Sequence, residues 1–267
     1  MTTIETIFLG IIQGLTEFLP VSSSGHLVVG KNLLGFREPE LLLDTALHFG
    51  TLVAVCIYFR SDLRQMIQAV WQWIFRREPP RSGSGLHANL ALMVIVGSIP
   101  TAIIGLVFKD PLERLFGSVT TVGVMLVVTG IIVAITRFIP EAHGKRDRVS
   151  VLIALAIGLA QGLAIVPGIS RSGATIVCAL LLGLNRDLAG RFSFLLCLPA
   201  ITGALLLQLD MAAVTRVGAV PLMVGFLVSA VVGFLALKLL MGMVRRGHFY
   251  YFAPYCWAIG ILTIVFA

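Results

Sequence analysis

QGLTEFLPVSSSGH (residues 13–26) and QGLAIVPGISRSGA (residues 161–174) are two polar, proline-containing stretches in an otherwise apolar sequence. They align without gaps at a constant offset of 148 residues. Six of the fourteen positions are identical: Gln13, Gly14, Leu15, Ser22, Ser24 and Gly25 match Gln161, Gly162, Leu163, Ser170, Ser172 and Gly173. Drift within apolar sequence would not keep polar residues in register, so the matches indicate two copies of one structural unit.

The composition indicates a membrane protein. Of 267 residues 58% are hydrophobic and 12% are charged, with a mean hydropathy of +0.98. A soluble domain normally carries about a quarter charged residues. The formal net charge is +7, but the basic residues lie in short loops between apolar segments. That pattern is typical of membrane orientation and argues against nucleic acid as a partner.

A helix needs about 20 mostly apolar residues to cross a bilayer. The predicted spans are residues 42–59, 87–108, 119–139, 188–208, 218–241 and 249–267. The stretch 62–76 has apolar residues at helical spacing and two tryptophans, which favours an amphipathic helix in the membrane interface.

The two polar stretches lie inside residues 2–35 and 150–184. Each region has two apolar halves that are too short to span, separated by a break that contains Pro20 or Pro167. We therefore expect two re-entrant helix hairpins, since irregular backbone at membrane depth needs a cover of protein or water.

Each hairpin is followed by three spans, an odd number, so the two copies have opposite topology. We predict an all-α polytopic membrane protein with six transmembrane helices and two re-entrant hairpins. It forms a single membrane domain, 1–267, with inverted repeats at 1–140 and 150–267. Such repeats place their site near the bilayer midplane, where the broken helices meet.

Basic residues set the orientation. With this topology thirteen of them lie on one side: Arg60, Arg64, Arg76, Arg77, Arg81, Arg137, Lys145, Arg146, Arg148, Arg186, Arg191, Arg245 and Arg246. Five lie on the other: Lys31, Arg37, Lys109, Arg114 and Arg216. The positive-inside rule makes the first side cytoplasmic. The first hairpin then opens to the outside and the second to the cytoplasm.

The second stretch has the chemistry of an anion site. Arg171 lies at a predicted helix start, where unpaired N–H groups and the positive end of the helix dipole favour phosphate. Ser170, Ser172 and Thr175 flank it, and a guanidinium fork suits phosphate oxygens. The alternative is that Arg171 pairs with a carboxylate for structural reasons.

The first stretch holds reactive groups. Ser23 and His26 are three residues apart and would share a helix face, so the imidazole could accept a proton from the serine or from a water. Glu17 would orient His26 or hold a divalent cation, and Gln13 lies one turn earlier. Ser22 and Ser24 are candidate substrate ligands, but serines before a helix are also common caps. His48 and Asp44 either line the same cavity or, for His48, form an ordinary core contact.

The motifs QGLTEFLPVSSSGH and PGISRSGAT closely resemble the signature segments of the undecaprenyl-pyrophosphate phosphatase family, known also for bacitracin resistance. The similarity extends along nearly the whole chain, including FSFLL at 192–196. It implies hydrolysis of the lipid pyrophosphate to undecaprenyl phosphate and inorganic phosphate, which recycles the carrier lipid of envelope polymers.

The resemblance also implies a divalent cation, Mg²⁺ or Ca²⁺, and a bacterial inner-membrane enzyme with its site facing the periplasm. By motif position the catalytic residues are Glu17, Ser23, His26 and Arg171. The substrate-binding residues are Gln13, Ser22, Ser24, Ser170, Ser172 and Thr175, and the metal ligands are Glu17 and Gln13. Many relatives have Glu where this chain has Gln13, which argues against any scheme in which position 13 must be a charged metal ligand. The competing hypothesis is a lipid-phosphate transporter that uses the same midplane site, and the sequence leaves open whether the chain forms a homodimer.

Overall fold

The chain folds as helices, as the apolar segments predict. The computed structural model describes residues 3–33, 41–76, 84–115, 117–140, 144–208 and 218–266. Over these residues helices are joined by turns, with one isolated β-bridge between Arg146 and Leu184. The predicted all-α class is confirmed.

Within the described residues, four helices are long and apolar enough to cross a membrane. They are α5 (Ser84–Val107), α7 (Val119–Ala134, continued by the 3₁₀ turn η2, Ile135–Phe138), α10 (Arg186–Gln208) and α12 (Ala219–Arg245). They match the predicted spans 87–108, 119–139, 188–208 and 218–241. The chain is therefore a multi-pass membrane protein, with the short helix α6 (Lys109–Leu115) following α5.

The other two predicted spans have shorter helices. Helix α3 (Leu41–Tyr58) is followed, after a 75° bend, by α4 (Arg60–Trp71) and the π-helical turn η1 (Gln72–Arg76). Helix α13 (Ala253–Val265) follows the 3₁₀ turn η5 (Phe249–Phe252). Whether 42–59 and 249–267 each cross the bilayer stays a prediction.

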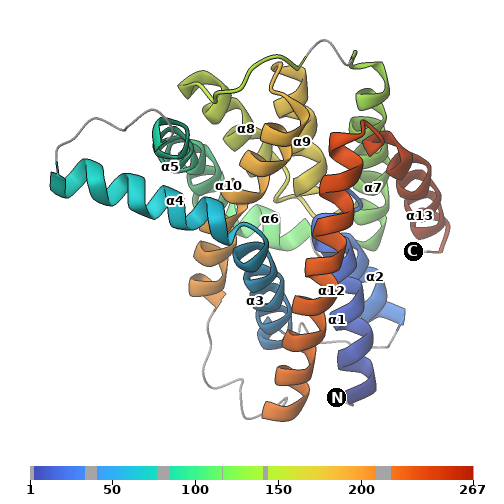
Figure 1. The fold of residues 1–267 in the computed structure, drawn as a ribbon. Helices are drawn as coiled ribbons and strands as arrows, with labels where there is room; N and C mark the ends of the chain where they lie inside the picture. The colour runs from blue at the N-terminus through green and yellow to red at the C-terminus, as the bar shows by residue number, and fades with distance from the viewer. Residues whose placement is uncertain are drawn as a thin grey trace.

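Helix α4 is amphipathic, as the pattern over 62–76 predicts. Met66 and Ala69 are buried, whereas Ile67 and Trp71 are exposed. The helix projects sideways from the bundle in Figure 1 and packs against α5. Its sharp turn away from α3 suits a helix that lies along the membrane surface.

Both polar stretches break a helix where expected. The first break separates α1 (Thr3–Phe18) from α2 (Ser23–Leu33), and the second separates α8 (Val151–Leu163) from α9 (Arg171–Leu181). In Figure 1 the α1–α2 pair lies in the lower half of the molecule and the α8–α9 pair in the upper half. Their re-entrant placement in a bilayer stays a prediction. Some residues used in the predictions lie outside the described residues. They are residues 2, 34, 35 and 267, at the ends of predicted segments, and the basic residues Arg37, Arg77, Arg81 and Arg216.

Each predicted hairpin packs on a long helix from the other half of the chain. Helix α1 packs along α12, and α8 packs along α5. In the proposed repeat α5 and α12 hold equivalent places, so each hairpin lies against the other copy's second span. The inverted repeat at 1–140 and 150–267 stays a prediction, and this exchange of partners is what such an arrangement would produce.

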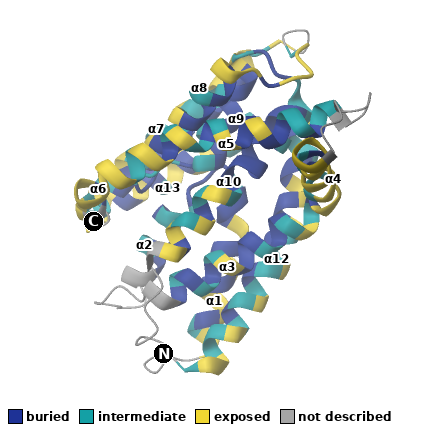
Figure 2. Ribbon diagram, turned by 90° about the vertical axis from the view of Figure 1, so that its left-hand side faces the viewer, coloured by how far each residue is buried: buried dark blue, intermediate teal, exposed yellow. Residues whose placement is uncertain are grey.

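Burial follows the pattern of a protein dissolved in lipid. Figure 2 shows buried residues along the inner faces of the helices and exposed ones along the outside. The outward residues of α5 and α12 include Ile95, Ile99, Leu227 and Leu235, each more than half exposed. A rim of large aliphatic side chains is stable where the surroundings are acyl chains rather than water.

Glycines let α5 and α8 cross closely. A Cβ atom built on Gly158 would overlap the carbonyl oxygen of Gly97, and one on Gly97 would lie 2.9 Å from the carbonyl oxygen of Ala154. Both obstacles are backbone, so neither can move aside cheaply. Close approach through small residues is a common way for helices to associate in lipid.

We expect Gly158→Ala to lower the melting temperature of the purified protein in detergent, because the methyl group forces α8 away from α5. Overpacking of this kind typically costs about 1–3 kcal/mol. Gly242→Ala in α12 is the control, since a Cβ there meets nothing within 4 Å. Equal melting temperatures for the two variants would show that the crossing is not tight.

Candidate functional site

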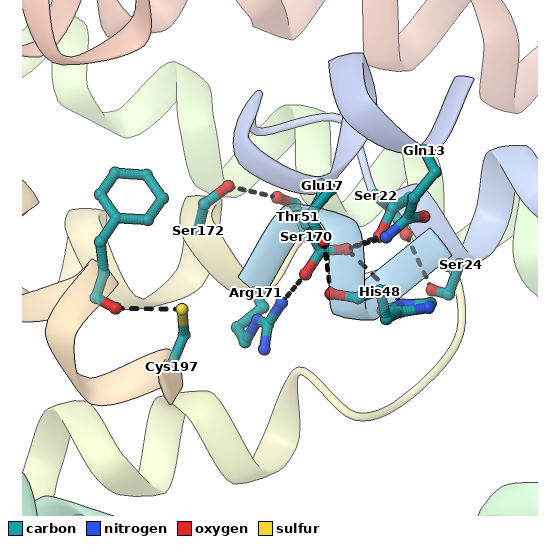
Figure 3. A network of polar contacts seen from close by, with 12 residues as sticks. Gln13, Glu17, Ser22, Ser24, His48, Thr51, Ser170, Arg171, Ser172 and Cys197 are labelled. Atoms are coloured by element: carbon teal, nitrogen blue, oxygen red, sulfur yellow. Dashed lines mark hydrogen bonds and ion pairs between the residues drawn. The ribbon is translucent and has the colours of Figure 1, made fainter. Parts of the chain in front are cut away.

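The two helix breaks meet at one carboxylate. Glu17 lies in the last turn of α1 with 1% of its side chain exposed. Arg171, the first residue of α9, donates from Nη2 to Glu17 Oε1. Figure 3 shows this pair at the centre of a network that draws on both polar stretches. The structure thus brings together residues 154 positions apart.

The other oxygen of Glu17 accepts two more hydrogen bonds. The hydroxyl of Ser23 donates to Oε2 at 2.6 Å, and the amide of Gln13 donates to Oε2 at 2.9 Å. His48 Nε2, from α3, lies 3.7 Å from the same oxygen. A buried carboxylate needs such partners, because desolvation of an isolated charge is costly. His48, which the sequence left between two interpretations, faces the site.

Gln13 presents an unpaired oxygen at the site. Its nitrogen faces Glu17, since the reverse orientation would bring two acceptors together. Its Oε1 is buried and has no hydrogen-bond partner. A carboxylate and an amide oxygen are the hard ligands that Mg²⁺ and Ca²⁺ prefer. No group of three His, Cys, Asp or Glu side chains suited to a metal occurs among the described residues. The site therefore fits a cation that takes its other ligands from water and substrate.

The same serine cap occurs at both breaks. Ser22 Oγ accepts from Gly25 N at 3.3 Å, and Ser170 Oγ accepts from Gly173 N at 3.1 Å. Each capping hydroxyl also pairs with the serine two residues on, Ser24 at 3.2 Å and Ser172 at 3.1 Å. This repetition at an offset of 148 shows that Ser22 and Ser170 have structural roles. Their substrate-binding roles, and those of Ser24 and Ser172, stay predictions.

The backbone at the first break is strained. Ser22 has φ of 67°, a left-handed conformation that is uncommon for a residue with a side chain. It directs its carbonyl oxygen to both the backbone N–H of His26, at 3.2 Å, and the ring Nδ1 of His26, at 2.8 Å. Strain of this kind persists where surrounding contacts hold it, often at a functional site.

His26 and Ser23, which the sequence paired, hydrogen-bond to different partners. Its Nε2 lies 2.8 Å from the hydroxyl of Tyr255 in α13, and its Nδ1 faces the Ser22 carbonyl. Ser23 donates to Glu17 instead. Both side chains belong to α2, but the Ser23 hydroxyl donates its hydrogen bond to the Glu17 carboxylate in α1.

Thr175 and Arg171 are linked within α9, where Thr175 Oγ1 donates to the Arg171 carbonyl oxygen at 2.9 Å. A helix of the other half supports this loop: Thr129 Oγ1 in α7 donates to Gly168 O at 2.8 Å and accepts from Ser170 N at 2.9 Å. Thr129 therefore fixes the start of α9. An isolated threonine inside an apolar span carries no signal for this role in the sequence.

A small enclosed cavity of about 10 Å³ adjoins the ion pair. It is lined by Glu17, Phe18, Arg171, Ser172, Thr175, Ser193, Phe194 and Cys197. This volume admits roughly one water molecule. Such a water would give a hydrogen-bond partner to the buried Ser193 Oγ, which has none among the described residues. A pyrophosphate is far larger. The partly exposed side chains of the network are those of Ser23, Ser24, His26, His48 and Arg171, so a larger ligand would meet the site there.

Comparison with known proteins gives a family over nearly the full length. Residues 6–262 match the family described as bacitracin resistance protein BacA. The undecaprenyl-diphosphatase of Desulfosudis oleivorans is 49% identical over 278 residues, covering 99% of this chain and 98% of that protein. The undecaprenyl-diphosphatase of Halothermothrix orenii is 43% identical over 270 residues, covering 100% of this chain and 99% of that protein.

Proposed function

Because this chain belongs to the bacitracin resistance protein BacA family, we propose that it hydrolyses undecaprenyl pyrophosphate to undecaprenyl phosphate and inorganic phosphate. The observation that carries the proposal is the chain of contacts from Arg171 through Glu17 to Ser23. These contacts support a site in which the Arg171 guanidinium binds phosphate, Glu17 is the base and Ser23 is the nucleophile, the three roles that hydrolysis of a phosphoric anhydride requires.

The pyrophosphate binds at the N-terminus of α9. A guanidinium has five N–H donors, and Glu17 engages Arg171 through one nitrogen. The remaining donors, with 25% of the side chain exposed, are open to phosphate oxygens. The helix dipole of α9 adds favourable potential for an anion.

Glu17 acts as the base toward Ser23. The Ser23 proton already points at Oε2 over 2.6 Å. In the proposed step Ser23 Oγ bonds to the terminal phosphorus and its proton passes to Glu17. The bond from that phosphorus to the bridging oxygen breaks, and undecaprenyl phosphate leaves. Water then attacks the phosphoserine and releases inorganic phosphate. The alternative is direct attack by a water on the same phosphorus, with Ser23 only a ligand.

Gln13 and Glu17 are the proposed protein ligands of a divalent cation. A bound Mg²⁺ or Ca²⁺ would neutralise charge on the pyrophosphate oxygens. The unpaired Gln13 Oε1 and the Glu17 carboxylate supply the two protein oxygens. Gln13 carries no charge, so the cation depends on the substrate for much of its binding.

The proposed location is the bacterial inner membrane, with the substrate entering from the periplasmic side. The excess of basic residues on one side supports this orientation, because that side is cytoplasmic by the positive-inside rule. The long lipid tail would leave sideways between helices into the acyl chains. The packing of each hairpin on the other copy's span supports a midplane site.

Phosphate release by the purified protein in detergent tests the function, because detergent removes any gradient that a transporter would need. We expect metal-dependent release from the C55 pyrophosphate and none from the C55 monophosphate. No phosphate release in detergent, together with lipid-phosphate transport by the protein in vesicles, would favour the lipid-phosphate transporter. The serine–carboxylate hydrogen bond argues against it, since binding alone does not require a positioned base.

In the second step His26 is the proposed base toward the water that attacks the phosphoserine. We expect His26→Ala and Ser23→Ala each to lower kcat by about 100-fold or more, the scale of one acid–base group. Ser23→Ala removes the nucleophile that contacts Glu17. Incubation with ³²P-labelled substrate followed by acid quench should trap label on the wild type and none on Ser23→Ala. Substantial turnover by Ser23→Ala would rule out the covalent step and leave direct attack by water.

A further inference from the structure

The hydrogen bonds of His26 define which ring nitrogen carries the proton. Nδ1 lies 2.8 Å from the carbonyl oxygen of Ser22. A carbonyl only accepts, so Nδ1 must be the donor. A neutral imidazole has one N–H, and its lone pair is therefore on Nε2.

Tyr255 is the partner of that lone pair. Its hydroxyl lies 2.8 Å from Nε2, so the phenol donates to the imidazole. The two rings are nearly parallel, with an interplanar angle of 6° and centroids 5.7 Å apart. The hydrogen bond and the parallel rings together define both the position and the plane of the imidazole.

Helix α13 holds the first break at a second point. Cys256, the next residue, donates from its sulfur to the carbonyl oxygen of Pro20 at 3.3 Å. Helix α7 does the same for the second break, where Thr129 donates to the carbonyl oxygen of Gly168. Pro20 and Gly168 differ by the repeat offset of 148 residues. The last helix of each half thus supports the break of the other half.

Packing does not explain the Tyr255 hydroxyl. The residue is 44% exposed, whereas the buried part of α13 is formed by Ala253, Cys256, Gly260 and Thr263. A phenylalanine would contribute similar apolar contact. The hydroxyl is the feature that reaches the site.

We infer that Tyr255 is a positioning residue for His26, which keeps the imidazole in the Nδ1–H tautomer with a basic Nε2 at the partly exposed side of the site. This inference rests on the proposed function only for its effect on turnover. Without the hydroxyl the ring can rotate or change tautomer, and the fraction of His26 ready for proton transfer falls. Substrate binding, which depends on Arg171, is left largely intact.

The test is Tyr255→Phe, which keeps the ring and removes the hydroxyl. We expect kcat to fall at least about tenfold, with little change in KM. A tenfold fall corresponds to about 1.4 kcal/mol, the scale of one hydrogen bond. Tyr251→Phe is the matched control. Tyr251 also stacks on a histidine, His248, with centroids 5.2 Å apart, but lies in η5 away from the site.

Two further measurements separate positioning from general damage. In a double-mutant cycle, Tyr255→Phe should cost nothing further in a His26→Ala background, because Tyr255 acts through that imidazole. In ¹⁵N-histidine NMR, the signal assigned to His26 by its loss in His26→Ala should show an unprotonated, hydrogen-bonded Nε2 that shifts in Tyr255→Phe and not in Tyr251→Phe.

Additive losses in the cycle, or a His26 signal unchanged by Tyr255→Phe, would overturn the inference. The NMR result does not depend on turnover. If the wild type releases no phosphate, the proposed function fails while the Tyr255–His26 contact is still tested.

Discussion

Glu17→Gln is expected to lower kcat at least about a thousandfold, the largest loss of any single conservative change in this protein. Glutamine has almost the same shape but cannot accept the Ser23 proton, and loss of a general base alone costs about 10²–10⁴-fold. The change also removes the negative charge beside Arg171. Three groups, Arg171, Ser23 and Gln13, donate to this carboxylate, and an amide can accept on one atom only.

The measurement is single-turnover phosphate release by the purified variant in detergent. Asp110→Asn, a change of an exposed carboxylate in α6, is the control for charge loss and should behave as wild type. A melting temperature near that of the wild type would show that the Glu17→Gln site is still assembled. Activity within tenfold of wild type would exclude Glu17 as the base.

Arg171→Ala is expected to cost about 2–4 kcal/mol of transition-state stabilisation, roughly 30- to 1000-fold in kcat/KM. In the described contacts Glu17 faces two basic side chains, Arg171 and His48, and of these only Arg171 donates a hydrogen bond to it. It also stands at the helix terminus that favours phosphate. Its loss leaves Glu17 buried without its principal counter-charge, so we also expect lower thermal stability.

Arg171→Lys separates charge from geometry. Lysine restores a positive charge beside Glu17 but has no planar fork for two phosphate oxygens. We expect stability to recover more fully than kcat/KM. Arg148→Lys, in an exposed loop, is the control. Near-normal activity of Arg171→Ala would contradict the anion site.

The helix breaks could be predicted from local chemistry. Each break holds a proline followed by a serine that can cap the next helix, Pro20 and Ser22 in the first and Pro167 and Ser170 in the second, and both helices end and restart around these residues. Serine caps were also predictable, because a hydroxyl before a helix start satisfies a free N–H within a few residues. Ser22 and Ser170 repeat that geometry at both breaks.

The partners of the reactive groups could not be predicted in the same way. Helical spacing places Ser23 and His26 on one face, but the turn at Ser22 aims the Ser23 hydroxyl at Glu17. His48 faces the site because α3 packs beside α1. Tyr255 reaches His26 from 229 residues away, and nothing near Tyr255 in the chain distinguishes it from an interfacial aromatic residue.

The two stretches at 13–26 and 161–174 show which features follow from the sequence and which depend on the tertiary structure. The sequence alone determined a membrane protein, two related helix breaks and the residue types of the proposed phosphate site, because hydropathy, capping and helix-breaking act over a few neighbouring residues. Only the tertiary structure decided that Arg171, Ser23 and Gln13 all contact Glu17, that Ser23 hydrogen-bonds to Glu17 and that Tyr255 contacts His26. Those contacts join different helices, and their geometry depends on how whole helices pack rather than on any local pattern.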